Sequence, residues 1–187
     1  IYKTIFVACD TSNIEKIKKI IIKTKNSKLK IIPKFGLQFF YSKQGRKFLE
    51  KLKIDFWLDL KINDIPQTAL SAIDSLKDLK RCKYITVHVN GGLEMLKAVK
   101  KEAKKINRKI KILGVTILTS LNNKSLKQIG HTKDLKKLVD KLKGLFDWSN
   151  VDFFTVESDP RRVDGGWQCL TEFDARYAWC GQIDRPK

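Results

Sequence analysis

The sequence predicts an α/β fold of the (β/α)8 barrel type, of which about six β/α units can be recognised. Short apolar runs alternate with longer segments of helical spacing, as in a parallel sheet with helical connections. The apolar runs are continuous rather than alternating, so both faces of each strand should be covered. The units repeat about every 26 residues, which is short for a doubly wound domain and suits a barrel.

The expected elements follow from these patterns. Pro66 stands where the first turn of a helix tolerates proline, directly after an apolar run and a short polar loop. No glycine-rich phosphate-binding motif follows any of the runs, which weakens nucleotide-cofactor alternatives. The predicted strands are 4–9, 29–33, 56–60, 84–89, 110–117 and 151–156, and the predicted helices are 14–24, 43–52, 66–79, 92–106 and 133–145.

Length and composition indicate a folded protein without a membrane segment. The 187 residues are 42% hydrophobic, which is enough for a packed core. No apolar run approaches the roughly 18 residues that cross a bilayer, and the first ten residues lack the features of a secretory signal. The absence of an initiating Met suggests a trimmed start. The four cysteines form no CxxC pair and no metal-ligand spacing, so a cytoplasmic protein with reduced thiols and no metal is expected.

The net charge of +19 admits two explanations. The 32 lysines far outnumber the 7 arginines and recur among Ile, Leu and Val in helical stretches, which is typical of solvated helix faces. A basic nucleic-acid-binding α/β domain is the alternative. Carboxylates at the ends of the predicted strands disfavour it, because they would repel a phosphate backbone.

The composition changes after residue 156, which divides the chain into a barrel domain, 1–156, and an atypical tail, 157–187. The tail carries a net charge of −1 against +20 for the preceding residues, and it holds two of the four Trp and two of the four Cys. It could be foreign, out of frame, disordered or a small natural appendage. Unless the tail or another chain covers them, the outer edges of the first and sixth strands should lie open.

Candidate functional residues lie where the predicted strands end, because a barrel of parallel strands builds its active site there. Taken singly, Asp10 could equally be a turn residue and Lys34 a surface residue. Asp59 and Lys61 are different, since residues two apart on a strand share one face and two charges in an apolar run lack a structural reason. The residues at strand ends are Asp10, Lys34, Asp59, Lys61, Asp64, His88, Asn90, Thr119 and Ser120.

The segment Asp59-Leu60-Lys61-Ile62-Asn63-Asp64-Ile65-Pro66-Gln67-Thr68 resembles the DxKxxDIPxT signature of the orotidine 5′-phosphate decarboxylases. Related decarboxylases and aldolases share DxKxxD but lack the DIPxT extension. Further pieces follow in the order of the family and extend the resemblance over about residues 4–121. They are Cys9-Asp10, Lys34-Phe35-Gly36, His88-Val89-Asn90-Gly91-Gly92 and 115–120.

The resemblance implies a cofactor-free and metal-free decarboxylation of orotidine 5′-monophosphate to uridine 5′-monophosphate in pyrimidine biosynthesis. It implies Lys61 as proton donor to C6 of the pyrimidine, with Asp59 beside the departing carboxylate. It also implies a cytoplasmic homodimer with shared active sites. The implied catalytic residues are Lys61, Asp59, Asp64 and Lys34, and the implied substrate-binding residues are Asp10, Lys34, Ile65, Thr68 and Ser120.

The C-terminal part departs from the family. No phosphate-gripping loop and no Gly-Arg pair after an eighth strand can be recognised, and Gly181-Gln182 and the arginines of the tail follow no expected strand. A catalytically impaired decarboxylase fragment without the phosphate-binding units is therefore a further alternative.

Overall fold

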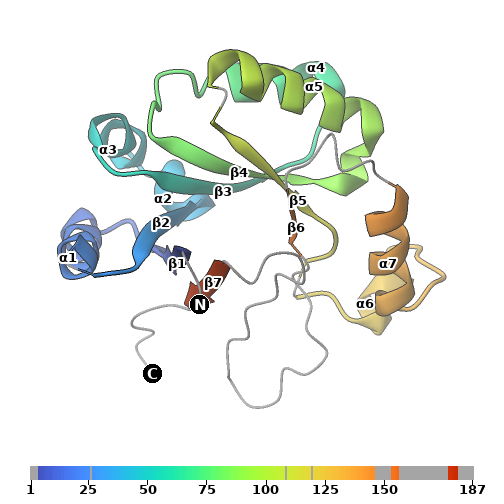
Figure 1. The fold of residues 1–187 in the computed structure, drawn as a ribbon. Helices are drawn as coiled ribbons and strands as arrows, with labels where there is room; N and C mark the ends of the chain where they lie inside the picture. The colour runs from blue at the N-terminus through green and yellow to red at the C-terminus, as the bar shows by residue number, and fades with distance from the viewer. Residues whose placement is uncertain are drawn as a thin grey trace.

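The structure is a computed structural model that describes residues 4–25, 27–107, 109–118, 120–145, 153–155 and 177–180. It has a curved sheet with helices along its outer side, the arrangement of part of a barrel wall (Figure 1). Every pair of neighbouring strands is parallel. The predicted α/β class, incomplete barrel type and parallel sheet are confirmed.

The strand order is β6-β5-β4-β3-β2-β1-β7, so the first six strands follow one another along the sheet. Each predicted strand is present, with bounds that differ by a few residues. The strands are β1 (Thr4–Ala8), β2 (Lys30–Gly36), β3 (Phe56–Ile62), β4 (Cys82–His88), β5 (Lys111–Val115), β6 (Phe153–Thr155) and β7 (Tyr177–Cys180).

The predicted helices are present as well. The helix expected over 66–79 ends earlier, at Asp74, because the chain continues in tight turns in which Leu76 and Leu79 bond back three residues. Leu76 and Leu79 nevertheless remain buried. The helices are α1 (Ile14–Lys25), α2 (Leu37–Phe40), α3 (Gly45–Lys51), α4 (Pro66–Asp74), the 3-10 turn η1 (Val89–Gly91), α5 (Gly92–Ile106), α6 (Asn123–Gln128) and α7 (Leu135–Leu145).

Two short helices were not predicted. A single turn such as α2 is too short to show helical periodicity. A signal for α6 does exist in the sequence, since the side chain of Asn122 caps this helix by accepting a hydrogen bond from the Ser125 backbone N–H at 2.9 Å.

Strand β7 corrects one expectation about the segment 157–187. It pairs in parallel with β1, with Thr4 opposite Tyr177, and so covers the outer edge of the first strand. The interpretation that Gly181-Gln182 follow no strand is wrong, because they come directly after β7. Four residues between Arg176 and Gly181 were too short a run to be recognised. The other residues of 157–187 lie outside the described part of the chain. The prediction that this tail could be disordered therefore concerns residues that the structure does not describe.

The sheet has an apolar cluster on each face. The larger cluster packs residues of the helices, such as Ile17, Ile73 and Leu96, against the strands. The smaller one contains Phe6, Ile32, Trp57, Tyr84 and Leu113, one residue from each of five neighbouring strands and none from a helix. It therefore lies on the face that the helices leave uncovered. Within the described ranges, no helix is long and apolar enough to cross a membrane.

Phe35 of β2 belongs to the larger apolar cluster, on the face of the sheet that the helices cover. Its ring centroid lies 4.9 Å from that of Phe39 and 5.9 Å from that of Phe56, and its side chain is fully buried. Such aromatic pairs add to the free energy of burial.

We therefore expect Phe35→Ala to lower the free energy of unfolding by about 3–5 kcal/mol, because it removes a buried ring and leaves a cavity. Urea denaturation followed by circular dichroism measures this loss. Tyr41→Ala is the matched control, since Tyr41 is 77% exposed and its change should stay within about 0.5 kcal/mol. Equal effects of the two substitutions would contradict this account of the core.

Candidate active site

A polar layer lies directly above the small apolar cluster, toward the carboxyl ends of the strands. Lys34, Asp59 and Thr86 each stand two residues after a member of that cluster on β2, β3 and β4. Because side chains alternate along a strand, the three polar side chains share the face of the cluster. All three residues are buried, with 7%, 6% and 1% of their surface exposed.

Asp59 is the centre of this layer. Its Oδ2 lies 2.9 Å from Lys34 Nζ, and its Oδ1 lies 2.8 Å from Lys61 Nζ. Oδ1 also accepts a hydrogen bond from the Thr86 hydroxyl at 2.9 Å. Both carboxylate oxygens are thus bonded to donors, as a buried charge requires.

A bulge in β3 brings Lys61 to Asp59. The register passes from Leu58 opposite Ile85 to Ile62 opposite Val87, so β3 has two more residues than β4 over this stretch. Lys61 has a φ of +50°, in the left-handed region that is costly for a residue with a Cβ atom. The spacing of two residues predicted correctly that both side chains share one face, although through a bulge and not a regular strand.

Opposite charges decide the protonation of Asp59. Burial by itself would raise the pKa of this carboxyl, but the charges of Lys34 and Lys61 and their hydrogen bonds hold it below its usual value. Asp59 is therefore ionised at neutral pH and can only accept hydrogen bonds.

Asp10 extends the network at the end of β1. Its Oδ1 lies 3.9 Å from Lys34 Nζ, which makes a weaker ion pair than the contact of Lys34 with Asp59. A Cβ atom at Gly36 would lie 3.3 Å from the same Asp10 oxygen, so the glycine leaves room for the carboxylate. Asp10 is about one third exposed, which keeps it accessible from solvent.

The apolar cluster forms an aromatic floor under the charges. The Phe6 ring packs edge-on against Trp57 and Tyr84, with centroids 5.0 and 5.1 Å apart. Lys34 Nζ lies 5.7 Å from the centroid of the Trp57 ring, within the range of a cation–π contact. This floor excludes water from below and leaves the carboxyl ends of the strands as the side from which a ligand could approach.

Two further titratable residues lie near the layer. His88 ends β4, and its half-burial together with the nearby charge of Lys61 lowers the pKa of its imidazole. It is therefore mostly neutral at pH 7. Burial and the charge of Asp10 raise the pKa of the Cys9 thiol to about 12, so this cysteine is a poor nucleophile.

The remaining sequence-predicted residues lie outside this network. Asp64 is exposed, and its Oδ1 accepts a hydrogen bond from the Ile65 backbone N–H at 2.7 Å. Ile65, which precedes α4, is 66% exposed, and Thr68 and Ser120 are also exposed. Thr119 lies outside the described residues.

Sequence reasoning missed Thr86. A threonine within an apolar strand is ordinary in a sheet and attracts no notice. The available signal was its position two residues before His88, on the strand next to Asp59.

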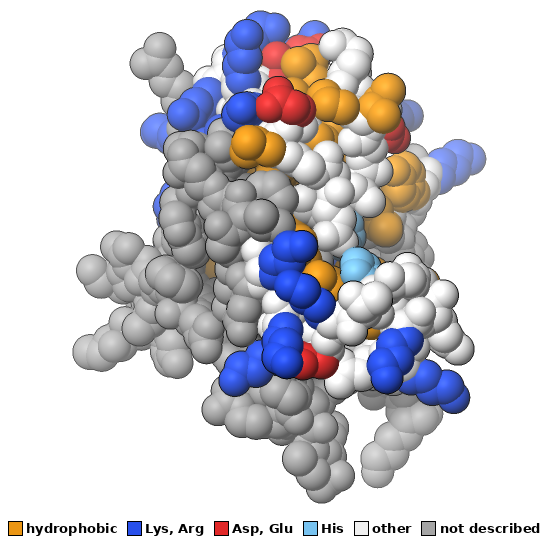
Figure 2. All heavy atoms as spheres, turned by 90° about the vertical axis from the view of Figure 1, so that its right-hand side faces the viewer, with side chains coloured by type: hydrophobic (Ala, Val, Ile, Leu, Met, Phe, Trp, Pro, Cys, Tyr) orange, Lys and Arg blue, Asp and Glu red, His pale blue; other side chains and the backbone are white. Residues whose placement is uncertain are grey.

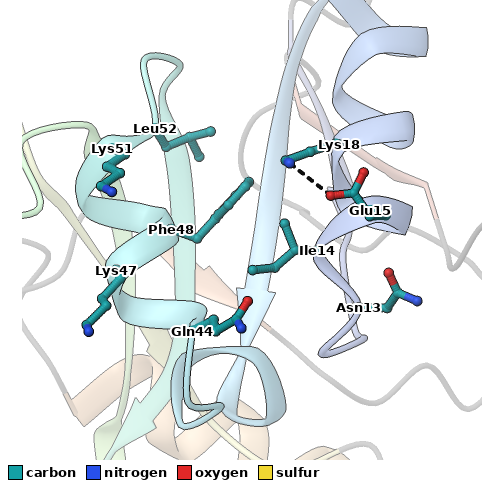
Figure 3. Close-up of a pocket in the computed structure, with 9 residues that line it drawn as sticks. All are labelled: Asn13, Ile14, Glu15, Lys18, Gln44, Lys47, Phe48, Lys51 and Leu52. Carbon is teal, nitrogen blue, oxygen red and sulfur yellow. Dashed lines mark hydrogen bonds and ion pairs between the residues drawn. The ribbon is translucent and has the colours of Figure 1, made fainter.

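The structure also has a groove between α1 and α3, of about 710 Å³. Figure 3 shows Ile14 of α1 and Phe48 of α3 pointing toward each other between the two helices, whereas Lys47 and Lys51, which also line the groove, extend from the other side of α3. The groove lies among the helices, and none of its lining residues belongs to the network of Asp59. Among the described residues, no group of three or more His, Cys, Asp or Glu could hold a metal ion.

The lysines and arginines do not form one continuous patch on the face that Figure 2 shows. On the face that Figure 2 shows, Lys and Arg side chains are scattered, with acidic and uncharged side chains between them. Several lysines pair with an acidic residue three positions earlier on the same helix, as Lys18 does with Glu15 and Lys97 with Glu94, each at 2.9 Å. These pairs favour the interpretation that the lysines cover solvated helix faces over the interpretation that they form a nucleic-acid-binding surface.

A barrel-type sheet that carries charged side chains at the carboxyl ends of its strands defines the class of α/β barrel proteins with a strand-end site. Residues 3–161 match the family model described as Orotidine 5'-phosphate decarboxylase / HUMPS family. The chain therefore belongs to this family, and the resemblance seen in the sequence is confirmed.

Relatives in sequence carry the name orotidine 5'-phosphate decarboxylase. The protein of Carboxydothermus hydrogenoformans is 40% identical over 142 residues, which are 72% of this chain and 58% of that protein. The protein of Buchnera aphidicola subsp. Acyrthosiphon pisum is 33% identical over 155 residues, which are 75% of this chain and 65% of that protein. Several such relatives are matched over only about half of their length.

Solved structures agree with this assignment. The orotidine 5'-phosphate decarboxylase of Lactobacillus acidophilus has a TM-score of 0.64 at 29% identity, over 75% of this chain and 65% of that one. The orotidine 5'-monophosphate decarboxylase of Methanocaldococcus jannaschii, complexed with the inhibitor BMP, has a TM-score of 0.64 at 25% identity, over 82% of this chain and 66% of that one.

The pairing of Asp59 should make stability depend on pH. The pKa of Asp59 in the folded protein lies below the unfolded value of about 4, so the ionised carboxylate stabilises the fold above that pH. This contribution is lost as the pH falls through the folded-state pKa. We expect Asp59→Asn to lower the free energy of unfolding by about 3–5 kcal/mol at pH 7, because Lys61 loses its anion and the buried Lys34 retains only the weaker ion pair with Asp10 at 3.9 Å.

Urea denaturation between pH 7 and pH 3 measures this difference, which should shrink as the pH falls. Asp74→Asn is the control, since Asp74 forms an exposed pair with Lys77 at 3.3 Å and should change stability by less than about 1 kcal/mol. A difference for Asp59→Asn that is constant over this pH range would contradict the assigned pairing.

Proposed function

We propose that this chain carries the catalytic residues of an orotidine 5′-monophosphate decarboxylase, which forms uridine 5′-monophosphate and CO₂ in pyrimidine biosynthesis. The observation that carries the proposal is the carboxylate of Asp59 held between the ammonium groups of Lys34 and Lys61 at 2.9 and 2.8 Å. Family membership and the names of the relatives support it. Because the chain spans about half the length of several relatives, the activity of the whole protein is part of the proposal.

The reaction breaks the bond between C6 of the pyrimidine and the carboxyl carbon. CO₂ leaves, and the electron pair stays on C6 in the plane of the ring, where the π system cannot delocalise it. A fixed positive charge beside C6 stabilises this carbanion without a covalent adduct. Lys61 supplies this charge and then transfers a proton from Nζ to C6 as general acid. Its side chain is 24% exposed, so the ammonium is accessible to a substrate.

Asp59 keeps Lys61 protonated and oriented. A negative charge at 2.8 Å favours the ammonium form of the lysine. Asp59 would also lie near the departing carboxylate of the substrate and disfavour the bound ground state. No cofactor or metal is needed, since the electrostatic field of the network performs this work.

The remaining site residues bind the substrate in this proposal. Asp10 and Lys34 bind ribose hydroxyls, which suits a carboxylate that remains partly exposed and an ammonium that lies 3.9 Å from it. Ser120, which is exposed after β5, contacts the pyrimidine.

The active site is shared between two copies of the chain. Asp64, Ile65 and Thr68 are exposed around the start of α4, and their side chains are available to the site of a second subunit. We therefore propose a cytoplasmic homodimer whose sites each use residues of both chains.

An impaired decarboxylase is the second candidate, and it rests on the partial coverage of the relatives. In this view residues 1–156 form the barrel domain and 157–187 replace units that would bind phosphate. Loss of remote phosphate contacts lowers kcat as well as affinity, because their binding energy organises the reacting centre. Turnover far below that of a relative, but still dependent on Lys61, would favour this candidate over a fully active enzyme.

We expect Lys61→Ala to abolish decarboxylation of orotidine 5′-monophosphate and to keep the fold. Removal of the proton donor and of its charge should lower kcat at least a thousandfold. Release of CO₂ and the circular dichroism spectrum are measured together. Lys77→Ala, on the exposed side of the helical layer, is the control and should leave kcat unchanged. A folded Lys61→Ala protein with full activity would exclude the proposed role.

The shared site predicts complementation between two inactive variants. Asp64→Asn and Lys61→Ala proteins should each lack activity, whereas a mixed dimer contains one site with neither substitution. Random exchange of subunits makes half of the dimers mixed, so about a quarter of the unsubstituted activity should return. Activity is measured after exchange of differently tagged chains has been demonstrated. No recovery in that mixture would show that each site is built within a single chain.

A further inference from the structure

We propose that Thr86 is the residue that positions Asp59 and Lys61 relative to each other. Its hydroxyl donates a hydrogen bond to Asp59 Oδ1 at 2.9 Å and accepts one from the Lys61 backbone N–H, also at 2.9 Å. The consequences for catalysis rest on the function proposed above, whereas the effect on the geometry of β3 does not.

The direction of both hydrogen bonds is determined. A backbone N–H can only donate, so the hydroxyl oxygen of Thr86 is the acceptor of the bond from Lys61. The paired carboxylate of Asp59 can only accept, so the hydroxyl proton must point to Oδ1. The single proton of the hydroxyl and one of its lone pairs are therefore both used, and Thr86 is 1% exposed.

The contact lies where the regular ladder between β3 and β4 is interrupted. Between the pairs Leu58–Ile85 and Ile62–Val87 the bulge of β3 shifts the register. In a regular pair of strands the Lys61 backbone N–H would donate to a backbone carbonyl of β4. Here it donates to the Thr86 hydroxyl instead, and this hydrogen bond helps to hold Lys61 at a φ of +50°. Such a conformation persists when surrounding contacts over-determine it.

One hydroxyl thus bonds both to the backbone of the lysine and to the carboxylate that its ammonium contacts. Lys61 Nζ lies 2.8 Å from the same oxygen, Asp59 Oδ1, to which Thr86 donates. The three groups form a closed set in which movement of the β3 backbone would change the distance between the ammonium and the carboxylate. Lys34 bonds to the other oxygen and does not depend on Thr86 in this way.

The substitution Thr86→Val tests the proposal because valine has nearly the same shape and no hydroxyl. Thr86→Ser retains the hydroxyl and removes only a methyl group, so it should restore what valine loses. Thr4→Val is the matched control, since Thr4 is a buried threonine at the start of β1, and the sheet places β2 and β3 between that strand and β4. All variants are prepared in the full chain, and their folding is checked by circular dichroism.

Amide hydrogen exchange gives a readout that does not require activity. In the unsubstituted protein and in Thr86→Ser, the Lys61 amide should be protected, and in Thr86→Val it should exchange at least tenfold faster, with the amides of β1 unchanged. Equal protection in folded Thr86→Val and unsubstituted protein would overturn the proposal. Should Thr86→Val fail to fold, exchange of the Lys61 amide in the unsubstituted protein at the rate of a free amide would overturn it as well.

Kinetics test the catalytic consequence. We expect Thr86→Val to lower kcat by roughly tenfold to a hundredfold with KM nearly unchanged, and Thr86→Ser and Thr4→Val to stay close to the unsubstituted protein. An unchanged kcat in Thr86→Val, beside faster exchange at Lys61, would mean that the hydroxyl supports only the backbone and would overturn the positioning role. Absence of decarboxylation in the unsubstituted protein would instead reject the proposed function, and the exchange experiment would still decide the role of Thr86 in β3.

Discussion

The burial of one carboxylate between two ammonium groups governs the arrangement of the site. Asp59 is 6% exposed and could not remain charged there without Lys34 and Lys61. The two lysines come from different parts of the sheet, one from the neighbouring strand and one from the bulge of the same strand. The bulge of β3 is thus what allows the Asp59 carboxylate to pair with Lys61 as well as with Lys34.

The arrangement of the strands and the main helices follows from the sequence because each depends on a local pattern. Largely apolar runs of five to eight residues and helices with one apolar face are visible without knowledge of the tertiary structure. The end of α4 was not predictable, since Leu76 and Leu79 continue the helical spacing although the backbone has changed to turns. Strand β7 was missed because its pairing with β1 depends on residues that are more than 160 positions earlier in the chain.

Some residues of the candidate site could likewise be predicted from the sequence, and others could not. The pairing of Asp59 with Lys61 could be predicted because both residues belong to one strand. That Lys34 lies near Asp59 followed from the general rule that parallel strands end at the same edge of a sheet. Thr86 was missed because its spacing from His88 is the only signal in the sequence, and the hydrogen bonds of its hydroxyl depend on a shift in register that no local pattern reveals. The roles of Asp64, Ile65 and Thr68 depend on a second chain and came from the resemblance alone.

The number of residues in the bulge has a consequence for how this sequence can change during evolution. The bulge adds two residues to β3, an even number, so Leu58 before it and Ile62 after it both pack against the helical side of the sheet. Loss of one residue between Leu58 and Ile62 would turn Ile62, the last residue of the strand, to the opposite face of the sheet. Loss of two residues that include Lys61 would keep Ile62 on the helical side and remove the ammonium group from the site. Deletion of two codons can therefore remove the lysine and keep the apolar face of the strand, whereas deletion of one codon also moves an apolar residue away from the core.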